Sequence, residues 1–144
     1  MFGDVPFFGS YYCRGDDKGR IIMPSDSKAS NDDSFILCYS DMAGAFDVFQ
    51  SNILNSRIRS LDDTIFSSLS TKTEVRKAKL LRNQICGSIV KPISVSSQRR
   101  LTLGTDFFRD SNFVIVHGEG DSFKLFTTED SYEAYTHHPY VKVK

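Results

Sequence analysis

Residues 18–26, KGRIIMPSD, return with changes 80 positions later as residues 98–106, QRRLTLGTD. The alignment places Arg20 over Arg100 and sets apolar residues at matching positions in the short segment that follows each arginine. Both segments are therefore typical of a charged loop that leads into a strand. A loop and a strand that recur in one order predict two copies of a single structural module.

A longer segment follows each copy and is also repeated. FILCYSDMAGAFDVFQS, residues 35–51, resembles FVIVHGEGDSFKLFTT, residues 113–128. In both segments two apolar runs flank a turn that carries Gly and Asp, which is typical of a β-hairpin. We expect strands at residues 35–40, 45–50, 113–118 and 123–128.

Turn residues predict where the strand after each charged loop ends. Pro24 ends the first of these strands and Gly104 ends the second. The hydroxyl of Ser25 or Thr105 is then expected to cap a brief helical turn.

A helix is expected to close each copy. In the second copy, Thr127 and Asp130 resemble a capping box before SYEAY, residues 131–135. In the first copy, the apolar residues that recur at helical spacing are Ile53, Leu54, Ile58 and Leu61.

The clearest predicted helix lies between the two copies. Thr71 and Glu74 form a capping-box signature at its start, and Gly87 offers a C-terminal stop. One face of this helix is apolar, so its basic residues point away from the core or along its edge. The apolar residues are Val75, Ala78, Leu81 and Ile85, and the basic ones are Arg76, Lys77, Lys79 and Arg82.

These elements predict an α+β fold that is mainly β, with a barrel-like core of two interlocked βαβ modules and connecting helices. Neither module alone can bury both faces of its strands, so each needs the other. We expect a first module at residues 1–70, a basic connecting helix at 71–90 and a second module at 91–144. Together they would form one compact pseudo-symmetric domain.

Composition excludes several classes of protein. The 144 residues are 40% hydrophobic and 12% aromatic, as in a folded domain. No apolar run approaches the roughly 20 residues of a membrane helix, and an acid stands near the N-terminus where a signal peptide carries bases. We therefore expect a cytoplasmic protein with no membrane partner.

Cys13, Cys38 and Cys86 are too far apart for a disulfide framework or a zinc cluster.

Charge is distributed unevenly along the chain, although the formal net charge is zero. Residues 72–100 hold eight Lys or Arg and one acid, Glu74, whereas the segments on both sides are acidic. A basic stretch of this kind fits either a solvated helix face or a nucleic-acid surface. Charge alone does not choose between them.

The repeat and its loop resemble the MraZ family, which is built from two tandem AbrB-like swapped-hairpin modules. The family motif, Asp-x-x-x-Arg followed by alternating apolar residues and Pro, is present as Asp16 to Arg20, IIM and Pro24, and the similarity extends from Gly9 to Tyr135. The resemblance implies a nucleoid-associated, DNA-binding transcriptional regulator, typically a repressor of the operon for cell division and cell-wall synthesis that contains its own gene. It also implies an octamer-like ring homo-oligomer that binds tandem repeats in double-stranded promoter DNA.

The first loop suits DNA contact on physical grounds. Asp16, four residues before Arg20, can accept hydrogen bonds from loop amides or from the guanidinium and so hold it in one direction. An arginine held in this way can bond a guanine edge or a phosphate with less loss of side-chain entropy. Lys18 would add a phosphate contact, and Gly19 would permit close approach. The alternative is a surface hairpin in which Asp16 and Arg20 merely pair with each other.

The second loop departs from the motif. Ser96 replaces the orienting acid and Arg99 replaces the glycine, so the loop is more basic and less constrained. We expect Gln98, Arg99 and Arg100 to hold phosphate without sequence preference, while Arg20 reads bases.

Other functions find less support in the sequence. Catalysis needs a nucleophile, a base and an orienting group, and nothing local links Cys86 with His117. His137 and His138 are too few for a structural metal site, and we expect no catalytic residue, metal or cofactor. The second candidate is a swapped-hairpin protein-binding or antitoxin-like module without promoter-specific regulation.

Overall fold

The computed structural model describes residues 9–23, 34–96, 98–109 and 111–136. The fold is α+β, as predicted, and is built on a six-stranded antiparallel sheet with the strand order β1-β7-β8-β4-β3-β5. A separate two-stranded ribbon pairs β2 with β6. The bounds of the sheet strands, in that spatial order, are Ser10–Arg14, Phe113–Gly118, Ser122–Phe126, Ala45–Gln50, Ser34–Tyr39 and Ile89–Ser94, and those of the ribbon are Arg20–Ile22 and Arg100–Thr102.

The two predicted β-hairpins are confirmed. β3 and β4 pair in antiparallel register, as do β7 and β8, and each strand lies within one or two residues of its predicted bounds. Apolar runs on either side of a turn with Gly and Asp were therefore enough to locate these strands.

The sheet joins the two halves of the chain through a pseudo-two-fold arrangement. Its strand order reads the same from either edge when β1 is exchanged with β5, β3 with β7 and β4 with β8. β4 and β8 meet at the centre, where Val48 lies opposite Phe123. Each edge strand pairs with the hairpin of the other half, β1 with β7 and β5 with β3. Each half of the chain thus completes the sheet with an edge strand that pairs with the hairpin of the other half.

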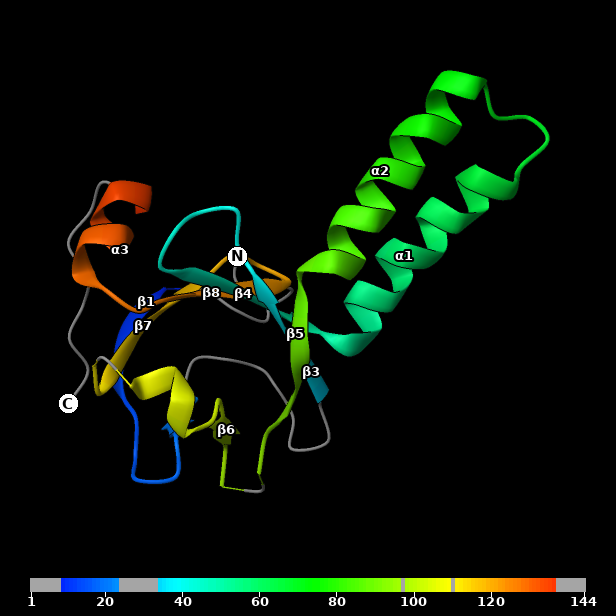
Figure 1. Cartoon of the computed structure of the whole chain (residues 1–144). Coiled ribbons are helices and arrows are strands. Elements are labelled where there is room, and N and C mark those ends of the chain that lie inside the picture. Colours follow the sequence, from blue (N-terminus) through cyan, green and yellow to red (C-terminus); the bar gives the residue numbers. More distant parts are fainter. Residues whose placement is uncertain (1–8, 24–33, 97, 110, 137–144) are drawn as a thin grey trace.

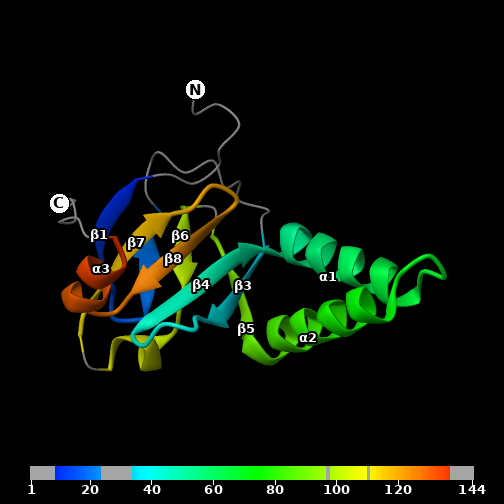
Figure 2. The same ribbon diagram turned by 90° about the horizontal axis from the view of Figure 1, so that it is seen from above.

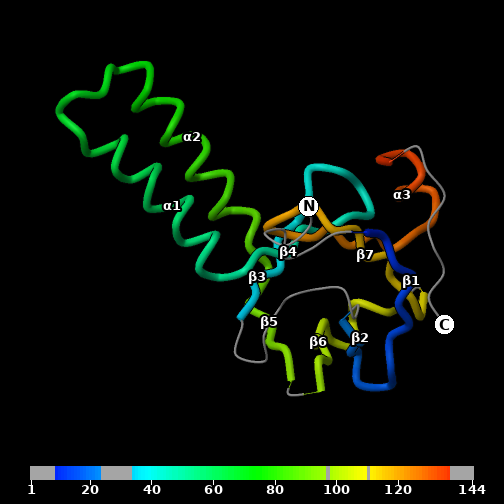
Figure 3. Tube along the Cα trace, turned by 180° about the vertical axis from the view of Figure 1, so that it is seen from behind, coloured from blue at the N-terminus to red at the C-terminus, as the bar shows by residue number. Residues whose placement is uncertain are grey.

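The sheet is open, so the expected barrel-like core is not a closed barrel. β1 and β5 form its two edges and do not pair with each other. The β2–β6 ribbon packs against one face of the sheet (Figure 3), and a single bridge between Leu101 of β6 and Val95, which follows β5, links it to one edge. The core between the two layers contains Ile21, Met23, Leu101 and Leu103 from the ribbon side and Phe35, Leu37, Val48, Phe123 and Leu125 from the sheet.

The helices lie at the two ends of the sheet. α1 (Ser51–Phe66) and α2 (Lys72–Ser88) pack against each other as a hairpin that projects from the β3–β5 end (Figures 1 and 2). α3 (Glu129–Thr136) lies beside β7 and β1 at the other end. None of these described helices is both long enough and apolar enough to cross a membrane.

The start of α2 confirms the predicted capping box, but its end differs from the prediction. Thr71 Oγ1 accepts a hydrogen bond from the Glu74 amide at 3.1 Å, and the Glu74 carboxylate accepts one from the Thr71 amide at 3.2 Å. The helix continues through Gly87, which was expected to stop it. Its final turn is closed by the amide of Ile89, which bonds the Cys86 carbonyl from an extended backbone, so no left-handed residue is required there.

The cap of α3 lies one residue beyond its predicted position. Thr128 Oγ1 accepts the hydrogen bond from the Ser131 amide at 3.1 Å. Thr127, which was expected to form the cap, instead donates its hydroxyl to the Gly44 carbonyl at 3.1 Å. This bond ties the end of β8 to the β3–β4 turn, so Thr127 is not available to the helix.

A short helical turn follows β6, as predicted, but its cap is different. The 3-10 helix η1 spans Thr105–Phe108, and Gly104 occupies the cap position without a side-chain hydrogen bond. The expected cap by the Thr105 hydroxyl is therefore wrong, because Thr105 already lies inside the turn. Pro24 and Ser25 lie outside the described residues.

Candidate nucleic-acid interface

The β2–β6 ribbon presents arginines from both halves of the chain on its outer face. Ile21 pairs with Leu101 at its centre, and both side chains are buried in the core. Since side chains alternate along a strand, Arg20 and Arg100 project from the opposite face. Ile22 pairs with Arg100 and is 63% exposed, so a large apolar side chain stands beside the arginines. The ribbon therefore offers a charged and partly apolar outer surface.

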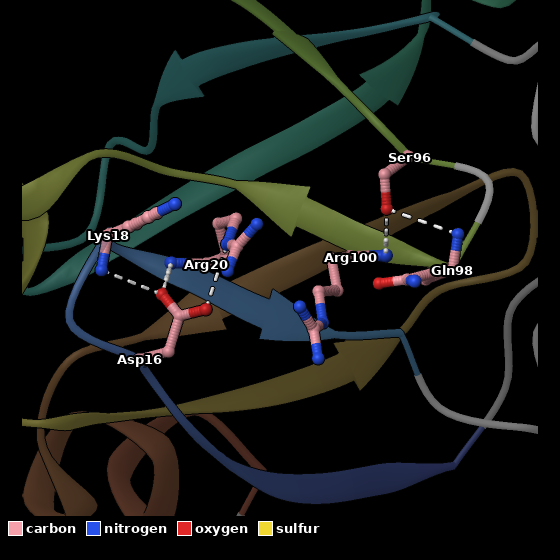
Figure 4. Close-up of polar contacts among 6 residues, drawn as sticks. All are labelled: Asp16, Lys18, Arg20, Ser96, Gln98 and Arg100. Carbon is pink, nitrogen blue, oxygen red and sulfur yellow. Dashed lines mark hydrogen bonds and ion pairs between the residues drawn. The ribbon is translucent and has the colours of Figure 1, made fainter.

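The first loop holds Arg20 as the sequence predicted. One carboxylate oxygen of Asp16 accepts hydrogen bonds from the amides of Lys18 and Arg20, both at 2.9 Å, and the other accepts Arg20 Nε at 2.8 Å (Figure 4). Lys18 is exposed at the tip of the loop. The carboxylate thus fixes both the loop backbone and the direction of the guanidinium.

Asp16 remains ionised at neutral pH. The hydrogen bond from the Arg20 amide is the main cause that lowers the pKa of Asp16 below 3.8. Slight desolvation opposes this effect, and bonds from the Arg20 guanidinium and the Lys18 amide add to it. A lowered carboxyl pKa means that the contact persists above the ordinary pKa and is lost only as pH falls through the lowered value. Arg20 is therefore held throughout the neutral range.

The second loop repeats the backbone of the first with a hydroxyl in place of the carboxylate. Ser96 Oγ accepts hydrogen bonds from the amides of Gln98 at 3.2 Å and Arg100 at 3.1 Å (Figure 4). The Ser96 amide bonds the Arg100 carbonyl at 2.9 Å, the same distance as from the Asp16 amide to the Arg20 carbonyl. The loss of constraint expected here applies to the arginine side chain and not to the backbone. Within the described ranges, Arg100 forms no ion pair.

Each loop tip bonds the strand end of the other half of the chain. Gly19 and Arg99 both have left-handed backbones, with φ of 73° and 61°. The Gly19 carbonyl accepts the Leu103 amide at 2.9 Å, and the Arg99 carbonyl accepts the Met23 amide at 2.8 Å. These two reciprocal hydrogen bonds fix the loops relative to each other. Both loops project from the same end of the molecule (Figures 1 and 3).

Gly19 is buried, so its place in the interface is indirect. A Cβ on Gly19 would lie 2.2 Å from the carbonyl carbon of Gly104, and its φ of 73° also favours glycine. The close approach expected at this residue is therefore to the backbone of the other half of the chain. Gly19 sets the position of Arg20 and Lys18 on either side of it.

The interface is basic overall. Residues 16–22 and 98–102 carry four Lys or Arg against two acids, Asp16 and Asp17. Because one of those acids is paired with Arg20, most of the remaining charge is positive. The exposure of Ile22 was not predicted from the sequence, although side-chain alternation next to the buried Ile21 indicates it.

Cys86 and His117, the residues considered for catalysis, lie on different elements, α2 and β7. Cys86 is exposed on α2, whereas Nδ1 of His117 on β7 lies 2.6 Å from the Ser10 hydroxyl. Burial raises the pKa of Cys13 to about 11, which disfavours its reactive thiolate form. Within the described residues no three His, Cys, Asp or Glu side chains form a metal-binding group. His137 and His138 lie outside the described residues.

Comparison with known proteins does not assign the chain to a family. No protein-family model matches the sequence, and no curated protein matches it either.

Proposed function

We propose that the protein is a sequence-specific DNA-binding transcriptional regulator of the MraZ type and that the β2–β6 ribbon contacts the duplex. The observation that carries the proposal is the pair of outward arginines, Arg20 and Arg100, on an antiparallel ribbon, one of them held by Asp16. A two-stranded ribbon fits the width of the major groove of B-DNA. Side chains on its outer face can therefore reach base edges.

Arg20 would read the sequence. Its Nε is engaged by Asp16, which leaves the two terminal nitrogens of the guanidinium for O6 and N7 of a guanine. Because Asp16 holds the side chain before DNA is bound, less conformational entropy is lost on binding. The exposed side chain of Ile22 could pack against a thymine methyl in the same groove.

The second loop and Lys18 would position the protein on the backbone. Gln98, Arg99 and Arg100 lie at or beside the tip of a loop that lacks an orienting acid, and contacts to phosphate do not require one base-facing direction. The exchange of Asp16 for Ser96 therefore breaks the pseudo-two-fold symmetry where DNA would bind. One protomer would then prefer an asymmetric site, which accords with direct tandem repeats rather than a palindrome.

A ring of protomers would provide the affinity that one ribbon lacks. As in the family that the sequence resembles, the proposed assembly is an octamer-like homo-oligomer on the promoter of the cell-division and cell-wall operon, associated with the nucleoid in the cytoplasm. Once one ribbon is bound, the others meet their repeats at high effective concentration. The regulator would act as a repressor by occupying the promoter.

Selection of bound duplexes from random DNA tests this function. With the purified full chain at near-physiological salt, we expect enrichment of a short motif repeated in tandem and in one direction. A population that stays random after several rounds would contradict DNA-sequence recognition. It would favour the second candidate, a swapped-hairpin protein-binding or antitoxin-like module, for which the exposed Ile22 would be a contact residue.

A further inference from the structure

The α1–α2 hairpin exposes large apolar side chains. Phe66 and Leu69 at its tip are 83% and 92% exposed, and Leu80 on the outer side of α2 is 59% exposed. Several large apolar side chains exposed on one projecting element indicate an interaction surface. The hairpin projects away from the sheet, so no other described element covers its outer side (Figures 1 and 2).

The same helix is strongly basic. α2 carries five Lys or Arg against one acid, Glu74. Arg82 points toward α1, where it pairs with Asp62 at 2.6 Å. Arg76 and Lys77 are exposed, and their spacing of four and three residues from Leu80 places all three on one helix face. No ion pair to Arg76 or Lys77 is present in the described part of the chain.

The opposite end of the molecule carries the complementary charge. α3 contains Glu129, Asp130 and Glu133 and no basic residue. Asp130 and Glu133 are exposed and three residues apart, so they share one side of the helix. Figure 1 shows α3 and the α1–α2 hairpin at opposite ends of the sheet.

We infer that the outer face of α2, formed by Arg76, Lys77 and Leu80, binds α3 of a second copy of this chain through Asp130 and Glu133. Net charges of opposite sign on α2 and α3 supply the complementarity, and the exposed apolar side chains supply area to bury. Because the two surfaces differ and lie at opposite ends, the contact is head to tail and repeats from copy to copy. The inference rests on the self-assembly that the proposed function requires and assigns its contact surfaces.

Two observations favour a second copy over DNA as the occupant of this face. A phosphate backbone would leave Leu80 and the apolar tip in water, whereas a protein surface can bury them. The hairpin also points away from the loops of the β2–β6 ribbon, which project from the other side of the molecule (Figures 1 and 3). Head-to-tail assembly therefore leaves every ribbon open to the duplex.

Paired charge reversal tests the contact. One variant carries Arg76→Glu with Lys77→Glu, and the other carries Asp130→Lys with Glu133→Lys. Like charges would then face each other in either homo-assembly, so the concentration for half-assembly should rise at least about 10-fold by light scattering. An equimolar mixture should regain the mass of the unmodified assembly, because each altered face then meets its altered partner. Arg109→Glu, a charge reversal that lies outside both helices, serves as the control and should assemble normally.

The possible outcomes distinguish failure of the α2–α3 contact from failure of the proposed DNA-binding function. A monomeric unmodified chain, variants that still assemble, or a mixture that stays dissociated would each overturn the α2–α3 contact. Loss of DNA affinity in the α2 variant without a change of mass would overturn it as well and assign α2 to DNA. A mixture that reassembles would support the contact even if DNA selection stays random, in which case only the DNA proposal fails.

Discussion

Replacement of Gly19 by alanine should destabilise the fold by about 2–5 kcal/mol, since a left-handed backbone at a non-glycine residue costs about 1–2 kcal/mol and overpacking adds about 1–3. The new Cβ would lie 2.2 Å from the backbone of Gly104, which has no flexible side chain to give way. The clash would push the loop before β2 away from the residues that follow β6 and would break the hydrogen bonds of the Gly19 carbonyl to the Leu103 and Gly104 amides. Urea unfolding of the purified variant measures the change in free energy.

Gly120→Ala provides the matched control for Gly19→Ala. Gly120 also has a positive φ, of 94°, but no atom lies within 4 Å of the added Cβ. Only the backbone term remains, so the expected cost is about 1–2 kcal/mol. Equal losses in the two variants would show that the contact with Gly104 is not tight and that Gly19 serves only the turn.

Arg20→Ala should weaken binding to the selected duplex by about 1–3 kcal/mol. It should also reduce the preference of the protein for that duplex over a scrambled one. Arg100→Ala should instead weaken binding to both duplexes alike and flatten the dependence of log affinity on log salt by about one unit. The reason is that Asp16 directs the Arg20 guanidinium, while Ser96 holds only the backbone of the second loop. Fluorescence anisotropy over a series of salt concentrations measures both effects.

Asp16→Asn sharpens the comparison between the two loops. The amide preserves the shape of the side chain but removes the charge that holds Arg20, so specificity should fall by less than it does in Arg20→Ala. Equal and sequence-independent losses in Arg20→Ala and Arg100→Ala would reject the division of roles between the loops.

The sequence predicted the two hairpins, but it did not predict that the sheet is open. Apolar runs on either side of a turn with Gly and Asp located both hairpins, and the 80-residue shift predicted two copies of one module. Closure into a barrel depends on the tilt and stagger of the strands and on which edges pair, and none of these is visible in a local pattern. The ends of helices were also less predictable, because a residue distant in the sequence can bond the side chain that would otherwise cap the helix. Thr127 bonds to Gly44, a residue 83 positions away, so its neighbour caps α3.

The site was predictable where its chemistry is local. Asp16 and Arg20 are four residues apart in one loop, and their contact followed from charge and spacing. The role of Gly19 did not, because Gly104 approaches it from the other half of the chain. The backbone arrangement of the second loop was not predicted from the sequence either. Ser96 keeps the backbone arrangement with a hydroxyl, which a comparison of charges alone does not reveal.

Arginine footprinting in the presence of duplex tests the proposed interface most directly. The full chain is treated with a guanidinium-specific dicarbonyl reagent, with and without the selected DNA, and the modification of each arginine is measured by mass spectrometry. We expect DNA to protect Arg20 and Arg100 from modification and to leave the modification of Arg59 on α1 and Arg76 on α2 unchanged. Protection of Arg59 and Arg76, with Arg20 and Arg100 modified as fast as without DNA, would contradict it.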